Sequence, residues 1–176
     1  IEGNVIHDVG SGVETNNAVR PFTIQKNMFF NITSDPYLGQ LIQIGRTNSG
    51  AGAVKVMCNY KDGRDGSLPA PVGGKPISIE DHISIFASTG YSEALPLEIG
   101  WNRIRGGATG GGRSGTGIQS ADDYPGTAPG RYYDFHDNLI VLANGAGISE
   151  HHGCSDCKIR NNIVDNRGEN AATNTS

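Results

Sequence analysis

The sequence predicts an all-β solenoid, in which the chain winds through similar turns that stack on one another. Three observations lead to this prediction. An apolar-x-x-Asn-x-apolar phrase recurs along the chain, a Gly-apolar phrase recurs upstream of it, and no segment has the periodicity of an amphipathic helix. The 26 Gly residues agree with the prediction, because glycine weakens helices.

The Asn phrase occurs in five full copies and two looser ones. The full copies are Ile1-Asn4-Ile6, Ile24-Asn27-Phe29, Ile99-Asn102-Ile104, Phe135-Asn138-Ile140 and Ile159-Asn162-Val164. The looser copies are Val56-Asn59-Lys61 and Ile79-His82-Ser84. Where no insertion intervenes, the copies are about 20 to 24 residues apart, which is a repeat length of solenoid proteins. We therefore expect about seven turns.

The phrase has a direct physical interpretation. Apolar residues at alternate positions turn one face of a short strand inward. The Asn between two such strands lies at a bend, where its amide can bond to neighbouring backbone. Asn side chains from successive turns then stack as a hydrogen-bonded ladder in the core. The phrase thus predicts that Asn27, Asn102, Asn138 and Asn162 are buried.

The Gly-apolar phrase marks a third strand in each turn. It begins at Gly12, Gly117 and Gly147, with Leu41 to Ile44 as a variant that lacks the glycine. The distance from Val13 to Asn27 equals the distance from Ile148 to Asn162, so the two phrases keep a constant offset. Each turn therefore carries three short strands.

The combined pattern resembles the right-handed parallel β-helix of the pectin-lyase-like superfamily, and residues 147–166 are a close match to its generic repeat. The resemblance implies a single β-helix domain over residues 1–167, followed by a polar tail at 168–176. That superfamily includes polysaccharide lyases, glycoside hydrolases, epimerases, phage tailspikes and adhesins. The fold therefore does not determine the function.

Charge and apolar patterning narrow the range of partners. The net charge of −4 gives no basic footprint, which argues against nucleic acid. No apolar run is long enough to cross a membrane. Because Ile1 lies inside a phrase and no capping element is evident, we expect a fragment of a longer chain. Its exposed strand edges are where copies could associate into an oligomer.

The cysteines leave alternatives open. The spacing of Cys154 and Cys157 fits ordinary turn and core cysteines, a local disulfide, or half of a metal site. A structural zinc site needs a second pair of ligands, and none is spaced suitably, so no metal site is assigned. Cys58 has no cysteine nearby in the sequence.

Insertions indicate where a functional site lies. The longest interval, between Asn102 and Asn138, contains two insertions, at 106–115 and 121–133, and they bracket the short strand 117–120. In a solenoid the strands are framework, and inserted loops form the walls of a groove. We therefore expect a cleft along this strand and its stacked neighbour.

Stacking Ile118 on Ile148 gathers polar side chains at this cleft. The candidate catalytic residues are Asp122, Asp123, Glu150, His151 and His152, and the candidate substrate-binding residues are Arg113, Gln119, Arg131, Tyr132 and Tyr133. Carboxylates with His suit acid–base chemistry on sugars, and Tyr offers a stacking surface. The same residue types also serve only to form turns, and that interpretation stays open.

Two functions from different classes follow. The first is a secreted or cell-surface, carbohydrate-active protein that binds an extracellular polysaccharide; if it also cleaves the polymer, it does so as a lyase or a glycoside hydrolase. In a lyase, the candidates for the base that takes the proton are Arg113, Arg131, His151 and His152. Asp122, Asp123 and Glu150 would hold calcium against a uronate. In a hydrolase, two of the carboxylates would act as acid and base. The second function is a structural or adhesive segment of a surface protein or tailspike.

Overall fold

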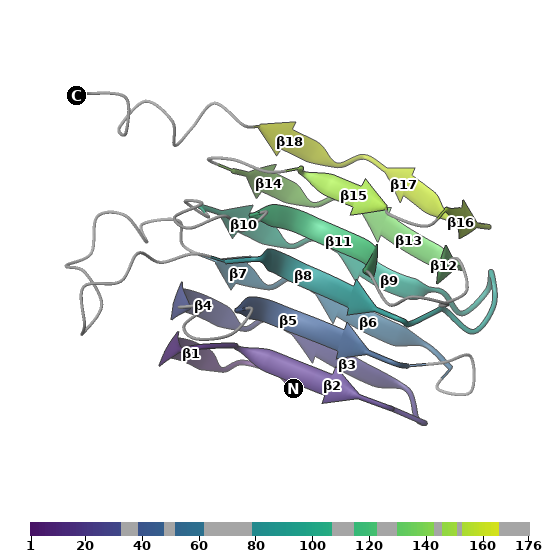
Figure 1. Cartoon of the computed structure of the whole chain (residues 1–176), viewed down its shortest axis with the longest axis horizontal. Helices are drawn as coiled ribbons and strands as arrows, with labels where there is room; N and C mark the ends of the chain where they lie inside the picture. Colours follow the sequence, from purple (N-terminus) through teal and green to yellow (C-terminus); the bar gives the residue numbers. More distant parts are fainter. Residues whose placement is uncertain are drawn as a thin grey trace.

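The chain is an all-β parallel solenoid whose strands stack as successive turns (Figure 1). The computed structural model describes residues 1–32, 39–47, 52–61, 79–106, 115–122, 130–142, 146–150 and 153–165. Within these ranges there is no helix, and hence none that could span a membrane. The predicted polar tail at 168–176 lies outside the described residues.

Three parallel sheets run along the solenoid. Sheet 1, in front in Figure 1, contains β2 (Val13–Asn16), β5 (Gln40–Gly45), β8 (Asp81–Phe86), β11 (Thr116–Asp122) and β15 (Ile148–Glu150). Sheet 2 contains β3 (Phe22–Gln25), β6 (Val54–Met57), β9 (Leu97–Gly100), β13 (Tyr133–His136) and β17 (Lys158–Arg160). Sheet 3 contains β1 (Val5–Val9), β4 (Met28–Ile32), β7 (Tyr60–Lys61), β10 (Arg103–Arg105), β14 (Leu139–Val141) and β18 (Ile163–Asp165).

Two short strands lie between sheets 1 and 2 in chain order. They are β12 (Gly130–Arg131) and β16 (Cys154–Ser155), which pair with each other. Cys154 and Cys157 form a disulfide with their Cα atoms 5.9 Å apart, whereas Cys58 is free and exposed. Of the alternatives left open by the sequence, the local disulfide is the one present.

The core is a column of apolar side chains from stacked strands. In sheet 2, Ile24, Val56, Ile99 and Phe135 stand in one register, and none is more than 1% exposed. Burying each such side chain stabilises the fold by about 1.5–3 kcal/mol. Ile159 continues the register, but it is 56% exposed because it belongs to the last described turn.

An asparagine ladder runs beside this column. Its members are Asn4, Asn27, Asn59, Asn102, Asn138 and Asn162. Each Nδ2 donates to the Oδ1 of the next Asn at 2.9–3.0 Å, and each backbone N–H donates to that same oxygen at 3.0–3.1 Å. Asn27, Asn102 and Asn138 are 1% exposed, as predicted. Asn162 is only half-buried, because it ends the ladder.

The ladder amides use their second proton as well. The Nδ2 of Asn102 also donates to Val56 O, and that of Asn138 to Ile99 O, both at 2.9 Å. The residue before each ladder Asn has a positive φ; these residues are Gly3, Lys26, Cys58, Trp101, Asp137 and Asn161. This left-handed conformation makes the bend at which the Asn side chain turns inward.

One predicted copy of the phrase is wrong. Residues 79–84 do not form a ladder turn, because Ile83 of β8 pairs with Ile42 and Ile118 in sheet 1, and Asn59 bonds directly to Asn102. Buried isoleucines occur in all three sheets, so they did not distinguish this strand from a ladder strand. In the described residues sheet 3 has six strands and the other two have five, rather than the seven turns expected.

Two polar side chains lie in the core instead. Lys61 is 1% exposed, and its Nζ donates to Arg105 O at 3.2 Å. His82 is fully buried, with Nδ1 2.9 Å from Thr116 O and with Nε2 lacking a partner. Burial, together with the charge of Lys61, lowers the pKa of His82 to about 3, so the ring is neutral and Nδ1 is its donor.

Replacing Asn138 by Ala should lower the free energy of unfolding, because donors and acceptors of the adjoining turns lose their partners. Each buried group left unpaired costs about 1–3 kcal/mol. Urea unfolding measures the loss. Asn16→Ala is the control, since Asn16 is exposed and lies outside the ladder. Equal stability of the two variants would contradict the structural role of the ladder.

His82 should make the fold acid-sensitive. The unfolded chain binds a proton at His82 near its ordinary pKa of 6.5, whereas the folded chain does so only near 3. The unfolded state therefore binds more protons in this range, and stability falls as the pH is lowered through it. The test variant is His82→Leu, because Leu41 occupies the position in β5 that lies beside His82 in β8. Unfolding curves measured at several pH values should show a free energy of unfolding that depends less on pH in this variant. An unchanged pH dependence would contradict the neutral buried ring.

Candidate functional site

The strands of the predicted site stack in the predicted register. In sheet 1, β11 pairs with β15 so that Ile118 lies beside Ile148, Gln119 beside Ser149, and Ser120 beside Glu150. The side chain of Asp122 and all of Asp123, His151, His152 and Arg113 lie outside the described residues. Their gathering at one cleft therefore stays a prediction.

Strand alternation separates two of the predicted residues. Ile148 packs against the core, and Glu150, two residues later, is on the same inward face. The Glu150 Oε1 atom is buried without a partner. Gln119 is on the opposite face of its strand from Ser120, the neighbour of Glu150. Gln119 and Glu150 therefore cannot line one groove through their side chains.

Tyr133 is a core residue. It is 1% exposed, its ring stacks on Phe135 with centroids 5.3 Å apart, and its hydroxyl donates to Ser88 O at 2.6 Å. Burial and the nearby charge of Glu150 raise the pKa of Tyr133 above its usual range. This placement corrects the expectation that the ring offers a stacking surface to a sugar.

Arg131 and Tyr132 lie at the corner between sheets 1 and 2, where they are accessible. The Arg131 guanidinium lies 4.8 Å from the centroid of the Tyr132 ring, and its Nη2 donates to the Tyr132 hydroxyl at 2.9 Å. Asp156 is 3.9 Å from the same nitrogen, and the Arg131 side chain is 53% exposed. Because a guanidinium has five N–H donors, these two contacts leave it able to bind an anion.

A second polar cluster on the outer face of sheet 2 was missed from the sequence. Glu98 accepts from Lys55 at 2.6 Å and lies 3.0 Å from His136 Nε2. The other ring nitrogen, Nδ1, is 2.9 Å from Asp137. The His136 ring thus lies between two carboxylates, and the four side chains form one connected row in the order Lys55, Glu98, His136 and Asp137.

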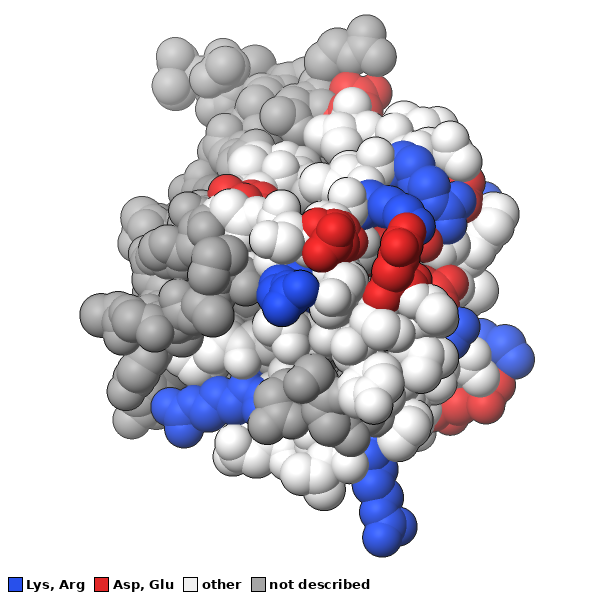
Figure 2. All heavy atoms as spheres, turned by 90° about the vertical axis from the view of Figure 1, so that its right-hand side faces the viewer, with Lys and Arg blue, Asp and Glu red and all other residues white. Residues whose placement is uncertain are grey.

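Two further ion pairs extend this face. Arg160 binds Asp134 through two hydrogen bonds of 3.0 Å, and Lys158 lies 2.9 Å from Glu93. Figure 2, which views the molecule from the side where β12 and β16 lie in Figure 1, shows acidic and basic side chains in contact on part of this surface and other basic side chains that stand alone. The charges of the ion pairs named here match one another, which favours a stabilising role.

The electrostatics of Glu98 agree with that role. Partial burial alone would raise its pKa, but the hydrogen bonds from Lys55 and His136 outweigh burial and lower the pKa below its usual range. The sequence did contain a signal for this cluster. Lys55, Glu98, Asp134 and Lys158 each precede a ladder Asn by the same number of residues, so they stack in one outward row.

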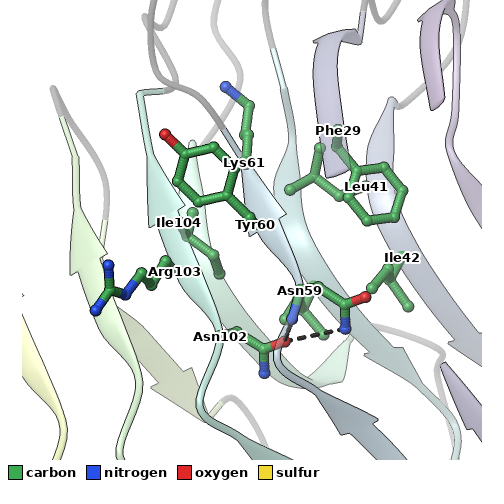
Figure 3. A pocket seen from close by; sticks show the side chains of 10 residues that line it. Phe29, Leu41, Ile42, Asn59, Tyr60, Lys61, Asn102, Arg103 and Ile104 are labelled. Atoms are coloured by element: carbon green, nitrogen blue, oxygen red, sulfur yellow. Dashed lines mark hydrogen bonds between the residues drawn. The ribbon is translucent and has the colours of Figure 1, made fainter. Parts of the chain in front are cut away.

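The cavity between sheets 1 and 3, among the described residues, is too small for a sugar. It has a volume of about 10 Å³ and is lined by Phe29, Ile42, Lys61 and neighbouring side chains (Figure 3). That volume holds about one water molecule. Within the described ranges, no group of three His, Cys, Asp or Glu side chains could hold a metal ion. The side chain of Asp122 and all of Asp123, two of the predicted calcium ligands, lie outside the described residues.

Comparison with known proteins gives no match to this chain, whether by family model, by curated sequence or by solved structure.

Gly100→Ala should displace His136. A Cβ at Gly100 would lie 2.5 Å from His136 Cε1, so the ring would have to leave its place between Glu98 and Asp137. Thermal unfolding should show a loss of stability. In the Gly100→Ala/His136→Ala double variant the clash is absent, so the combined loss should be smaller than the sum of the single losses. Additive losses would show that the glycine does not make room for the ring.

Proposed function

We propose that this chain is a carbohydrate-active β-helix protein that binds an extracellular polysaccharide. The observation that carries the proposal is the pairing of Arg131 with Tyr132 at the corner beside β11. A flat guanidinium held against an aromatic ring is suited to a sugar acid. The guanidinium binds a carboxylate through two parallel N–H groups, and the ring adds apolar surface for a pyranose.

Cleavage by a lyase or hydrolase mechanism remains part of the proposal, with Asp122, Asp123, His151 and His152 as the reacting groups. Asp156 lies near Arg131 and offsets part of the guanidinium charge without cancelling it. In this proposal Arg131 therefore binds and orients the substrate. Glu150 is left out of the reacting groups, because its Oε1 atom is buried on the inward face of β15.

We further propose that the solenoid is right-handed and pectin-lyase-like. Right-handed crossover between parallel strands is the general rule in proteins, and the Asn at the bend between sheets 2 and 3 matches the repeat that suggested the resemblance. We also propose that the protein is secreted or displayed on a cell surface. The Cys154–Cys157 disulfide supports this location, because disulfides persist in oxidising compartments.

A structural or adhesive solenoid is the second candidate. The observation in its favour is the mutual pairing of charges on sheet 2, where Lys55, Glu98, His136, Asp134 and Arg160 satisfy one another. A surface that has only to be soluble and stable needs no more than this. The exposed Arg131 distinguishes the two candidates, since a purely structural protein would tolerate its loss.

Arg131→Ala should weaken binding of polygalacturonate by about tenfold or more, because a charge-assisted hydrogen bond contributes about 1.5–3 kcal/mol. Arg131→Lys should bind with intermediate affinity, since lysine keeps the charge and loses the two-pronged geometry. Isothermal titration calorimetry measures both.

The control is Arg20→Ala, which removes an exposed arginine elsewhere and should leave affinity unchanged. Dextran, a neutral polymer, should bind more weakly than polygalacturonate to the wild type. Equal affinities of the Arg131→Ala variant and the wild type for polygalacturonate would overturn the assignment of Arg131. Binding of neither polymer by the wild type would favour the structural candidate.

A further inference from the structure

The corner between sheets 2 and 3 presents an ordered row of outward side chains. Each ladder Asn turns into the core, so the residues immediately before and after it face outward. In sheet 3 the residues after the Asn stand in one register along the solenoid: Val5, Met28, Tyr60, Arg103, Leu139 and Ile163. This corner is separate from the one that carries Arg131 and Tyr132.

Aromatic and basic side chains come together in the middle of this row. Trp101 is 56% exposed and Tyr60 is 39% exposed. Arg103 is exposed and pairs with Tyr60 across adjacent turns, while Trp101 and Arg103 flank the same buried Asn102. Tyr60 and Arg103 are register partners on the neighbouring strands β7 and β10, and both are drawn in Figure 3. Three side chains suited to sugar binding thus occupy neighbouring positions of the backbone at this corner.

The fold does not require a tryptophan at this position. Its φ is +59°, in the left-handed region that bulky residues avoid, and the equivalent residues in other turns include Gly3, Lys26 and Asp137. The only ring contact that Trp101 makes within the described residues is an edge-to-face contact with His136, with centroids 6.1 Å apart. A large ring held in a strained, exposed position suggests use by a ligand.

Arg103 also differs from its neighbours. Lys26, Lys55 and Arg160 on or near this corner each bind a carboxylate. Arg103 has no acidic partner among the residues that the structure describes. An exposed, unpaired guanidinium beside two aromatic rings can bind an anion while the rings cover the apolar faces of a sugar.

We propose that Trp101, Arg103 and Tyr60 form a second binding surface for an anionic polysaccharide, in which the polymer runs along the solenoid axis. Trp101 stacks on a pyranose ring, Arg103 binds the carboxylate of a uronate, and Tyr60 contacts the polymer one turn away, about 4.8 Å along the axis. The ligand class rests on the proposed function. Because the two surfaces occupy different corners, one molecule could hold two polymer strands or gain affinity from one strand that reaches both.

The protein contains one tryptophan, so its fluorescence reports this surface directly. Titration with polygalacturonate should shift Trp101 emission to shorter wavelength and reduce its quenching by acrylamide, since a bound sugar would cover the ring. The same titration with the Arg131→Ala variant should still give both changes. Unchanged emission and quenching in a wild type that binds the polymer by calorimetry would overturn this proposal and leave the proposed function intact.

Affinity measurements supply the second readout. In the Arg131→Ala background, Trp101→Ala and Arg103→Ala should each weaken the remaining binding of polygalacturonate by about three- to tenfold. Tyr91→Ala and Arg20→Ala are the matched controls, because they remove an exposed aromatic ring and an exposed arginine elsewhere. Losses no larger than those of the controls would overturn the second surface. A wild type that binds no polymer at all would overturn both proposals.

Discussion

The asparagine ladder is the interaction on which the rest of the structure depends. Each Oδ1 accepts two protons from the preceding turn, and Nδ2 donates both to the next ladder Asn and to backbone, as Asn102 and Asn138 illustrate. In a dry core an unpaired amide is costly, so the ladder tolerates neither a missing member nor a shifted register. The ladder therefore fixes how the strands of sheets 2 and 3 stack along the solenoid axis. The strand in sheet 1 completes each turn, and the loops before and after it differ in length.

The same bend determines which side chains reach solvent. The residue before each ladder Asn is held at positive φ, and its side chain stays outside while the amide turns in. On the strands of sheet 2, by contrast, outward charges from adjacent turns stand close enough to pair, as Glu98 does with Lys55 and His136. Charges on these strand faces thus pair with one another. The corners carry Arg131, whose contacts with Tyr132 and Asp156 leave some of its N–H donors free, and Arg103, which has no acidic partner among the described residues.

The sequence was sufficient for an all-β parallel solenoid with a buried Asn ladder, because the spacing of the full Asn phrases matches the register of the ladder. The spacing identified Asn59 as a ladder member, although Lys61 stands where the other phrases have an apolar residue. The Gly-apolar phrase also stacked Ile118 on Ile148 correctly. The sequence placed residues 79–84 wrongly, since buried isoleucines occur in every sheet and His82 merely resembles an Asn in polarity. It also grouped Glu150 with outward residues, because stacking two strands does not say which face each side chain occupies. Contacts such as Glu98 to His136 depend on turns whose separation in sequence varies with the insertions.

The stacking of the turns also explains how the core accommodates polar residues. Lys61 and His82 occupy places where neighbouring turns carry Phe29, Ile104 and Leu41, and both find backbone carbonyls. A solenoid core is a narrow column, so a polar side chain there is never far from the carbonyl row of the next strand. The column therefore accepts a buried amine and a neutral imidazole that a globular centre would exclude. Because polar residues in this core can be purely structural, burial alone is a poor guide to function in this fold, and exposed side chains left unpaired at the corners are the better one.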